Sequence, residues 1–203
     1  MRGAVLAGGT ASRYAGLPKG LLLVGGRRIL DRVVDAVTAA TGAAPLLVAN
    51  AADAPQWRPD LQCVPDRLPG SGSLGGIYTA VRAGAEPVLC VAWDMPFVSV
   101  PLLQALVQES PRCDAFLPES DSHRGLEPLC AVYGPACRVP IEQALARGDL
   151  RAIAFHEAVR VGTLSLGQVR AFGDPATLFF NVNRPEELKR AEEIWQRRGI
   201  RGS

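Results

Sequence analysis

The stretch VLCVAWDMP, residues 88–96, decides the fold. Its first five residues, Val88–Ala92, are apolar on both faces of an extended chain, which predicts a central strand covered by helices on each side. The strand then runs directly into Asp94. Because ligands of open α/β sheets bind outside the carboxyl ends of the strands, the same stretch predicts that Asp94 lies at a ligand site.

Outward from this strand, short apolar runs alternate with helical patterns along the chain. The alternation is typical of βαβ units stacked into a mostly parallel sheet, and we expect a single α/β domain over residues 1–203. Strands are expected at Gly3–Ala7, Pro45–Ala49, Gln62–Val64, Ala115–Pro118 and Leu129–Tyr133, with a further extended run at Lys19–Val24. Helices are expected from Ile29 onward, at Ser73–Ala83, Pro101–Val107 and Val139–Ala146, near Leu150–His156 and from Pro185, with fraying over 197–203.

The composition excludes several classes of protein. A chain of 203 residues with 48% hydrophobic content can bury a sizeable core. Its net charge of +2 is too small for a general nucleic-acid or anionic-membrane surface. Five cysteines without a C-x-x-C pair, together with two histidines, favour reduced thiols over disulfides or structural zinc. The apolar run Ala4–Ala7 is too short for a signal peptide or membrane span, so we expect a cytoplasmic protein.

The first candidate site is the loop Gly8-Gly9-Thr10-Ala11-Ser12-Arg13, followed by Lys19. Glycines let the backbone curl so that successive N–H groups point at phosphate oxygens, while Arg13 and Lys19 neutralise a triphosphate. The loop matches neither the P-loop pattern G-x-x-x-x-G-K-S/T nor the dinucleotide pattern G-x-G-x-x-G. A plain tight turn between strand and helix is the alternative interpretation.

Asp94 is the candidate metal ligand. Mg²⁺ prefers one or two carboxylates together with phosphates and water, and a carboxylate at the carboxyl end of a central strand suits that role. An Asx-turn with Pro96 is the rival interpretation.

Two further segments carry polar or flexible groups. If Asn181-Val182-Asn183 is extended, both amides point to the same side and can reach phosphate oxygens or metal-bound water. Asparagines are also common as turn formers and N-caps. The glycine-rich segment 70–76 lets a bulky ligand approach the backbone, or it is a surface linker.

Taken in order, these pieces resemble the molybdenum cofactor guanylyltransferase family, within the nucleotidyltransferases that share a Rossmann-like GT-A fold. The resemblance spans nearly the whole chain and implies a three-layer α/β/α domain with a mostly parallel sheet. The blocks that carry it are Leu6-Ala7-Gly8-Gly9, Ser12-Arg13, Lys19-Gly20-Leu21-Leu22, Gly72-Ser73-Leu74-Gly75-Gly76-Ile77, Asp94-Met95-Pro96-Phe97, Glu127-Pro128-Leu129 through Tyr133, and FNVNRPEEL at 180–188.

The resemblance also implies a set of site residues. The implied catalytic residues are Arg13, Lys19 and Asp94, and Asp94 is the implied Mg²⁺ ligand. The nucleotide-binding set is Leu6, Ala7, Gly8, Gly9, Arg13, Lys19, Asn50, Asp66, Gly75, Asp94, Asn181 and Asn183. A carboxylate at Asp66 suits guanine, because it accepts hydrogen bonds from the two neighbouring donors on that base's pairing edge. Stabilising the turn at 65–72 is the alternative role for Asp66.

The sequence departs from the family pattern at three positions. Tyr14 stands where methionine is usual, Pro18 where an aspartate commonly precedes the lysine, and Trp93 where a small residue or cysteine precedes the aspartate. A proline before the lysine is familiar elsewhere in the superfamily. The departures therefore bear on the choice of base more than on nucleotidyl transfer.

The implied reaction joins GTP and molybdenum-bound molybdopterin with Mg²⁺ as cofactor. The terminal phosphate of the pterin attacks the α-phosphorus of GTP and pyrophosphate leaves, with no covalent protein nucleophile. The loop Glu119–Glu127, with His123 and Arg124, and the segment Arg147–Arg151 offer charge for the pterin, unless they are solvated surface. Protein partners would be molybdenum-insertion proteins or apo-molybdoenzymes. The alternatives are a cytidylyl- or sugar-nucleotidyltransferase, or a nucleotide-binding module without turnover.

Overall fold

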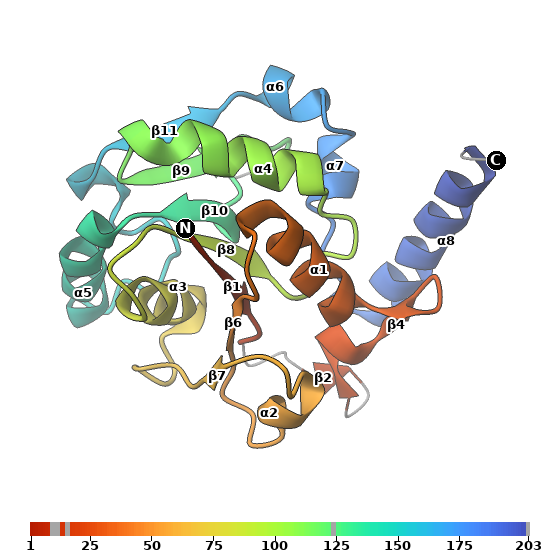
Figure 1. The fold of residues 1–203 in the computed structure, drawn as a ribbon, viewed down its shortest axis with the longest axis horizontal. Helices are drawn as coiled ribbons and strands as arrows, with labels where there is room; N and C mark the ends of the chain where they lie inside the picture. Colours follow the sequence, from red (N-terminus) through yellow and green to blue (C-terminus); the bar gives the residue numbers. More distant parts are fainter. Residues whose placement is uncertain (9–12, 15–16, 123–124, 202–203) are drawn as a thin grey trace.

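The computed structural model describes residues 1–8, 13–14, 17–122 and 125–201, and of residues 13, 14, 17 and 199–201 it describes the backbone alone. Its centre is a seven-stranded sheet in the order β11-β9-β10-β8-β1-β6-β7 (Figure 1). The strands are β1 (Arg2–Leu6), β6 (Leu46–Val48), β7 (Cys63–Val64), β8 (Val88–Ala92), β9 (Ala115–Pro118), β10 (Cys130–Tyr133) and β11 (Val161–Leu164). β10 runs antiparallel to β8 and β9, and the pairs β1–β6, β1–β8, β6–β7 and β9–β11 are parallel.

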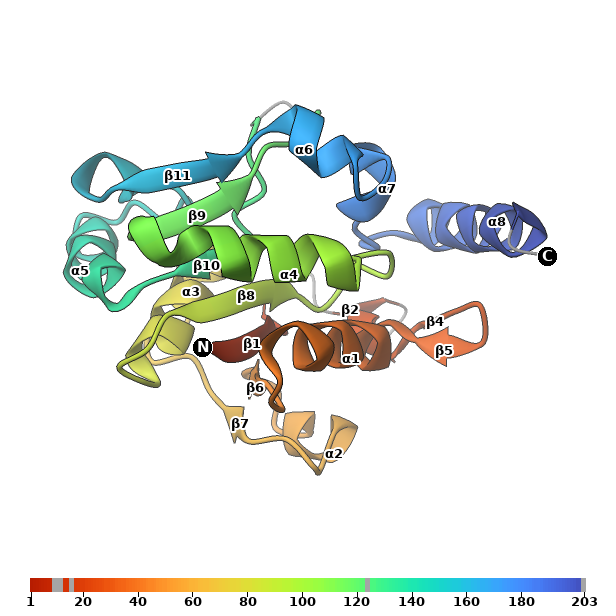
Figure 2. The ribbon, with the colours of Figure 1, turned by 45° about the horizontal axis from the view of Figure 1, so that its top comes forward.

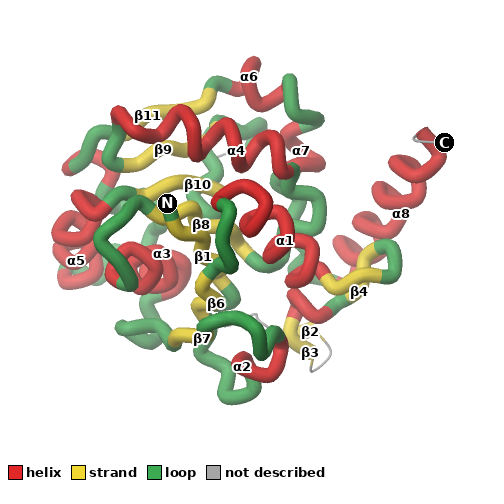
Figure 3. The backbone as a smooth tube through the Cα atoms, viewed as in Figure 1, coloured by secondary structure: helices red, strands yellow, loops and turns green. Residues whose placement is uncertain are grey.

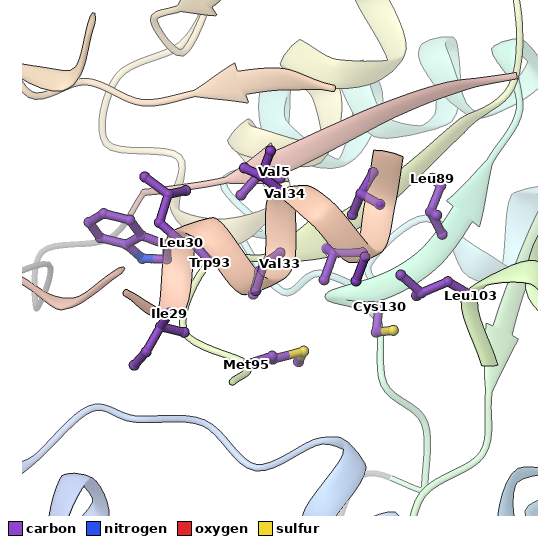
Figure 4. Packing of buried hydrophobic residues seen from close by; sticks show 14 of the residues in the cluster. Val5, Ile29, Leu30, Val33, Val34, Leu89, Trp93, Met95, Leu103 and Cys130 are labelled. Atoms are coloured by element: carbon purple, nitrogen blue, oxygen red, sulfur yellow. The ribbon is translucent and has the colours of Figure 1, made fainter. Parts of the chain in front are cut away.

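Helices cover both faces of the sheet (Figure 2). On one face α1 (Ile29–Thr41) and α4 (Val100–Glu109) pack against Val5, Leu89 and Val91 (Figure 4). On the other, α3 (Gly72–Arg82) and α5 (Arg138–Ala146) pack against the alternate strand residues. All five residues of β8 are buried. The predicted three-layer α/β/α fold with a buried central strand is therefore confirmed.

The remaining elements are short, except for the last helix. They are β2 (Arg13–Tyr14) with β3 (Leu17–Pro18), the 3-10 turn η1 (Lys19–Leu21), β4 (Leu23–Val24) with β5 (Arg27–Arg28), α2 (Ala54–Trp57), η2 (Ser110–Arg112), η3 (Pro135–Cys137), η4 (His156–Ala158), α6 (Leu166–Arg170), α7 (Pro175–Leu178) and α8 (Pro185–Arg201). α8 extends away from the sheet beside the β4–β5 hairpin (Figure 3). It continues past residue 197 to Arg201, and the fraying expected there stays a prediction.

Two expectations about secondary structure are wrong, and one strand of the main sheet was not expected. Lys19–Val24 is not one extended run, because η1 comes first and the β4–β5 hairpin then turns through Gly25 and Gly26, whose φ angles of 57° and 72° suit a tight hairpin turn. Residues 152–155 form turns instead of the helix expected near Leu150–His156, and only the short 3-10 helix η4 begins at His156. β11 was not expected at all, because as an edge strand it buries only Leu164 and so lacks an apolar run.

All five cysteines are free thiols, as expected. Burial raises the pKa of Cys137 to about 12, and it raises the pKa of Cys90 and Cys130 as well, which makes these thiols unreactive. Within the part of the chain that is described, no helix is both long and apolar enough to cross a bilayer.

Candidate active site

The carboxyl ends of β1 and β8 form the floor of a cavity of about 540 Å³. The two strands are parallel neighbours with Leu6 opposite Ala92, and the Trp93 amide donates to the Leu6 carbonyl at 3.2 Å. The segments that follow them therefore leave the sheet side by side. The cavity is lined by Leu6, Gly8, Lys19, Val48, Asp66, Gly72, Ser73, Gly76, Ala92, Trp93, Asp94, Ser122, Leu126, Glu127, Pro128, Leu129, Asn181 and Asn183.

Seven of the predicted nucleotide-binding residues meet in this cavity: Leu6, Gly8, Lys19, Asp66, Asp94, Asn181 and Asn183. The others differ. Ala7 is buried and its amide donates to the Val48 carbonyl at 2.8 Å, and Gly75 faces Ser71, so Gly76 lines the cavity in its place. Gly9 lies outside the described residues, and Arg13 is described only as backbone of β2.

Lys19 is a buried cation at the cavity wall, with 6% of its surface exposed. Its Nζ donates to Asn183 Oδ1 at 2.5 Å, so the contact joins the first part of the chain to the last. The Glu187 carboxylate in turn accepts from the amides of Asn183 (2.5 Å) and Arg184 (2.9 Å), which caps the start of α8. The end of the chain is thereby fixed against Lys19.

Asp94 follows β8 and its carbonyl accepts from the Val182 amide at 2.9 Å. Burial raises the pKa of the Asp94 carboxyl, and the positive charge of Lys19 opposes this increase only in part. The ionised form of a carboxylate in such surroundings is stabilised by a nearby cation. No group of three or more His, Cys, Asp or Glu side chains suited to a metal occurs among the described residues, so Asp94 is not part of an all-protein metal cage there.

The donors beside Asp94 nevertheless suit Mg²⁺. Asn181 also lines the cavity, and its Nδ2 donates to the Phe179 carbonyl at 2.9 Å, which leaves the amide oxygen for a ligand. A carboxylate and an amide oxygen are hard oxygen donors of the kind that Mg²⁺ accepts alongside phosphate and water. Because Val182 between the asparagines is fully buried, Asn181 and Asn183 both face the cavity, as an extended segment predicts.

The other end of the cavity holds Asp66 next to two glycines. Asn50 Nδ2 donates to Asp66 Oδ2, and Asn50 Oδ1 accepts from the Asp66 amide, each at 2.7 Å. Burial raises the pKa of the Asp66 carboxyl, opposed by the Asn50 hydrogen bond. A Cβ at Gly8 or Gly76 would lie 3.8 or 3.9 Å from the Asp66 carboxylate, so the absent side chains leave room there for a flat ligand. Asn50 does not line the cavity; it holds Asp66.

Sequence reasoning did not assign roles to several lining residues. Glu127–Leu129 belongs to a block that was noticed, Ser122 and Leu126 belong to the loop suggested for the pterin, and Trp93 was noticed only as a departure from a family pattern. Of the charged segments suggested for the pterin, His123 and Arg124 lie outside the described residues. The segment 147–151 does not line the cavity, and Arg151 pairs with Asp149 at 2.5 Å, which favours a solvated surface.

The fold has three layers, and its cavity lies at the carboxyl ends of adjacent parallel strands, with a buried lysine and a carboxylate in the wall. With the family match below, these features place the chain in the nucleotidyltransferase class of enzymes. The family model described as the MobA-like NTP transferase domain matches residues 3–161, and the chain belongs to that family.

Among curated proteins, the chain is 35% identical to the probable molybdenum cofactor guanylyltransferase of Pelotomaculum thermopropionicum, over 93% of this chain and 90% of the relative. It is 32% identical to the molybdenum cofactor guanylyltransferase of Desulfosudis oleivorans, over 94% and 93%. Among solved structures, molybdopterin-guanine dinucleotide biosynthesis protein A from Archaeoglobus fulgidus superposes with a TM-score of 0.82 at 30% identity, covering 97% of this chain and 100% of that one.

Proposed function

We propose that this enzyme transfers GMP from GTP to the terminal phosphate of molybdenum-bound molybdopterin, forms the guanine dinucleotide cofactor and releases pyrophosphate. The names of the relatives support the substrates. The observation that carries the proposal is the meeting of Gly8, Lys19 and Asp94 in one cavity, with Asn183 bound to Lys19. Three separate parts of the sequence thus supply a glycine turn, a cation and a carboxylate to one ligand.

Lys19 is suited to bind the phosphates of GTP. Its ammonium has three donors and one is used on Asn183, so two remain for phosphate oxygens. The bond to Asn183 also fixes the direction of the long side chain before the nucleotide arrives, which limits the entropy lost on binding. We propose that Gly9 and Arg13, in the preceding loop, add further phosphate contacts.

Asp94 and the amide oxygen of Asn181 would hold Mg²⁺, on the donor chemistry described above. Such an ion supplies positive charge to the triphosphate. The chain itself contributes a half-buried carboxylate: desolvation disfavours its ionised form, and the nearby Lys19 charge offsets this in part.

The transfer needs no covalent bond to the protein. An oxygen of the acceptor phosphate forms a bond to the α-phosphorus while the bond from that phosphorus to the bridging oxygen breaks, and the electron pair leaves with pyrophosphate. Lys19 and the loop at Gly8 orient the triphosphate for this in-line displacement and offset its charge. We propose that the acceptor lies against Leu126–Leu129, on the cavity wall opposite the Asp66 end.

Asp66 is proposed to read the base. A carboxylate oriented by Asn50 accepts from the N1–H and N2–H₂ donors of guanine, whereas cytosine and adenine do not offer that pair. Asp66 is half-buried, and leaving an acceptor unpaired once a base covers it is costly, so this contact discriminates against the wrong base.

The test is pyrophosphate release with Mg²⁺ and molybdenum-loaded molybdopterin, comparing GTP with CTP, ATP and UTP. Of the four nucleotides, only GTP should give rapid release of pyrophosphate. Preference for CTP, or turnover with a sugar phosphate in place of the pterin, would support the other transferases of the superfamily. Tight GTP binding with no release under these conditions would support a binding module. Cytoplasmic location, and docking to molybdenum-insertion proteins or apo-molybdoenzymes, stay predictions.

A further inference from the structure

Gly20 and Trp93 touch so closely that glycine is the one residue that fits. A Cβ on Gly20 would lie 2.9 Å from Trp93 Cδ2 and 3.1 Å from Cζ3, and closer still to Cε3. Gly20 does not have the positive φ that Gly25 and Gly26 of the neighbouring hairpin have. The backbone therefore does not demand glycine here; the indole ring does.

The Trp93 ring also stacks on Trp57 of α2. The two ring centroids are 5.1 Å apart with the planes inclined by 19°, and both side chains are buried. Trp57 is fixed in its turn, because its Nε1 donates to Asp53 at 3.1 Å and its carbonyl accepts from Arg28 at 3.1 Å. Trp93 thus has a rigid support, and Figure 4 shows it among Leu30 and other core residues.

Each partner of this contact is the chain neighbour of a charged site residue. Gly20 follows Lys19, and Trp93 precedes Asp94. The ring edge therefore sets how closely the turn η1 approaches the end of β8, and with it the placement of Lys19 relative to Asp94. We propose that Trp93 and Gly20 form a positioning pair, which we call the Gly20–Trp93 brace, that holds Lys19 and Asp94 in register for nucleotidyl transfer.

The proposal rests on the proposed function and adds a role for two residues outside the predicted site. Neither brace residue is a catalytic residue, since each acts through its charged neighbour. A core contact alone would affect the stability of the fold. A positioning contact also affects the rate at saturating substrate, because a displacement of about 1 Å at reacting groups can lower the rate by ~10²-fold.

The experiment compares Gly20→Ala, Trp93→Ala, the double variant and Trp93→Phe with the unaltered enzyme. The rate is kcat for pyrophosphate release at saturating GTP, acceptor and Mg²⁺, well below each Tm. Gly20→Ala should lower kcat by about 10- to 100-fold with a small change in the KM for GTP. Trp93→Phe keeps a six-membered ring and should retain more of kcat than Trp93→Ala. Once Trp93 is removed, Gly20→Ala should have little further effect, because the two changes break the same contact.

Gly162→Ala is the matched control. A Cβ there would meet Cys113 Sγ and would lie 2.8 Å from Phe116 Cδ2, so it strains a similarly close side-chain contact on edge strand β11, outside the cavity. It should lower Tm and leave kcat unchanged. Should Gly20→Ala not fold, Trp93→Phe and Trp93→Ala still decide the question.

The brace is refuted if the folded variants keep kcat within about twofold of the unaltered enzyme, or if the Gly20→Ala loss is undiminished in the Trp93→Ala background. Failure of the proposed function would look different, because the unaltered enzyme would then release no pyrophosphate from GTP.

Discussion

The two ends of the cavity each hold a carboxylate, and their surroundings differ. Asp94 lies near the cationic Lys19, whereas Asp66 is paired with the neutral amide of Asn50. Burial raises the pKa of both carboxyls, but a charge opposes the increase at Asp94 and a hydrogen bond opposes it at Asp66. The difference indicates that one end is built to manage charge and the other to recognise a pattern of hydrogen bonds.

The largest effect should come from removing the charged end itself. Asp94→Ala is expected to lower kcat by at least ~10³-fold, because it removes the proposed metal ligand and with it transition-state stabilisation. Circular dichroism should show an intact fold. Asp149→Ala removes a half-buried aspartate that is paired with Arg151 outside the cavity, and it should leave kcat unchanged. Near-normal turnover in Asp94→Ala would remove the basis for assigning the charged end to catalysis.

Lys19→Met should give the next largest effect. Losing one preorganised electrostatic group costs about 10²- to 10³-fold in rate, and the loss of phosphate contacts should also raise the KM for GTP. The chain offers a close control in Lys189→Met, since Lys189 is exposed on α8. A stopped-flow measurement of pyrophosphate release separates the two effects. Equal losses in the two variants would mean that Lys19 acts only through net charge.

The Asp94 end of the cavity was more accessible to sequence reasoning than the Asp66 end. Asp94 was found because the fully apolar β8 marks a central strand, and the carboxyl end of such a strand is where ligands bind. Asn181 and Asn183 were found because alternate residues of an extended segment face the same side. These are local patterns. The hydrogen bonds between Asn50 and Asp66, the bond from Lys19 to Asn183 and the Gly20–Trp93 contact join residues distant in sequence, so no local pattern predicts them.

Substitutions at the Asp66 end, which is proposed to bind the base, should change selectivity between nucleotides more than the rate. Asp66→Asn replaces an acceptor by a donor opposite N2–H₂ of guanine, so the preference for GTP over ITP in kcat/KM should fall by about 10- to 100-fold, equivalent to ~1–3 kcal/mol. ITP is the informative comparison because hypoxanthine lacks the N2 amino group. Asn50→Ala should move selectivity in the same direction by a smaller factor. An unchanged GTP-to-ITP ratio in Asp66→Asn would place the base elsewhere.

The smallest effect concerns stability, and it follows from the raised pKa of Asp94. A carboxyl whose folded pKa exceeds its unfolded value binds protons more tightly in the folded state. Stability from this group therefore rises as pH falls from the folded pKa toward the unfolded value, and the penalty of keeping the group ionised is fully present above the folded pKa. Asp94→Asn removes that penalty, so Tm at pH 7 should increase, and ~1 kcal/mol corresponds to about 2–4 °C in a chain of this size. The gain should shrink below the folded pKa, where the unaltered enzyme is already protonated. A Tm that falls at pH 7 would show that the electrostatic attraction between Lys19 and Asp94 outweighs the cost of desolvating the carboxylate.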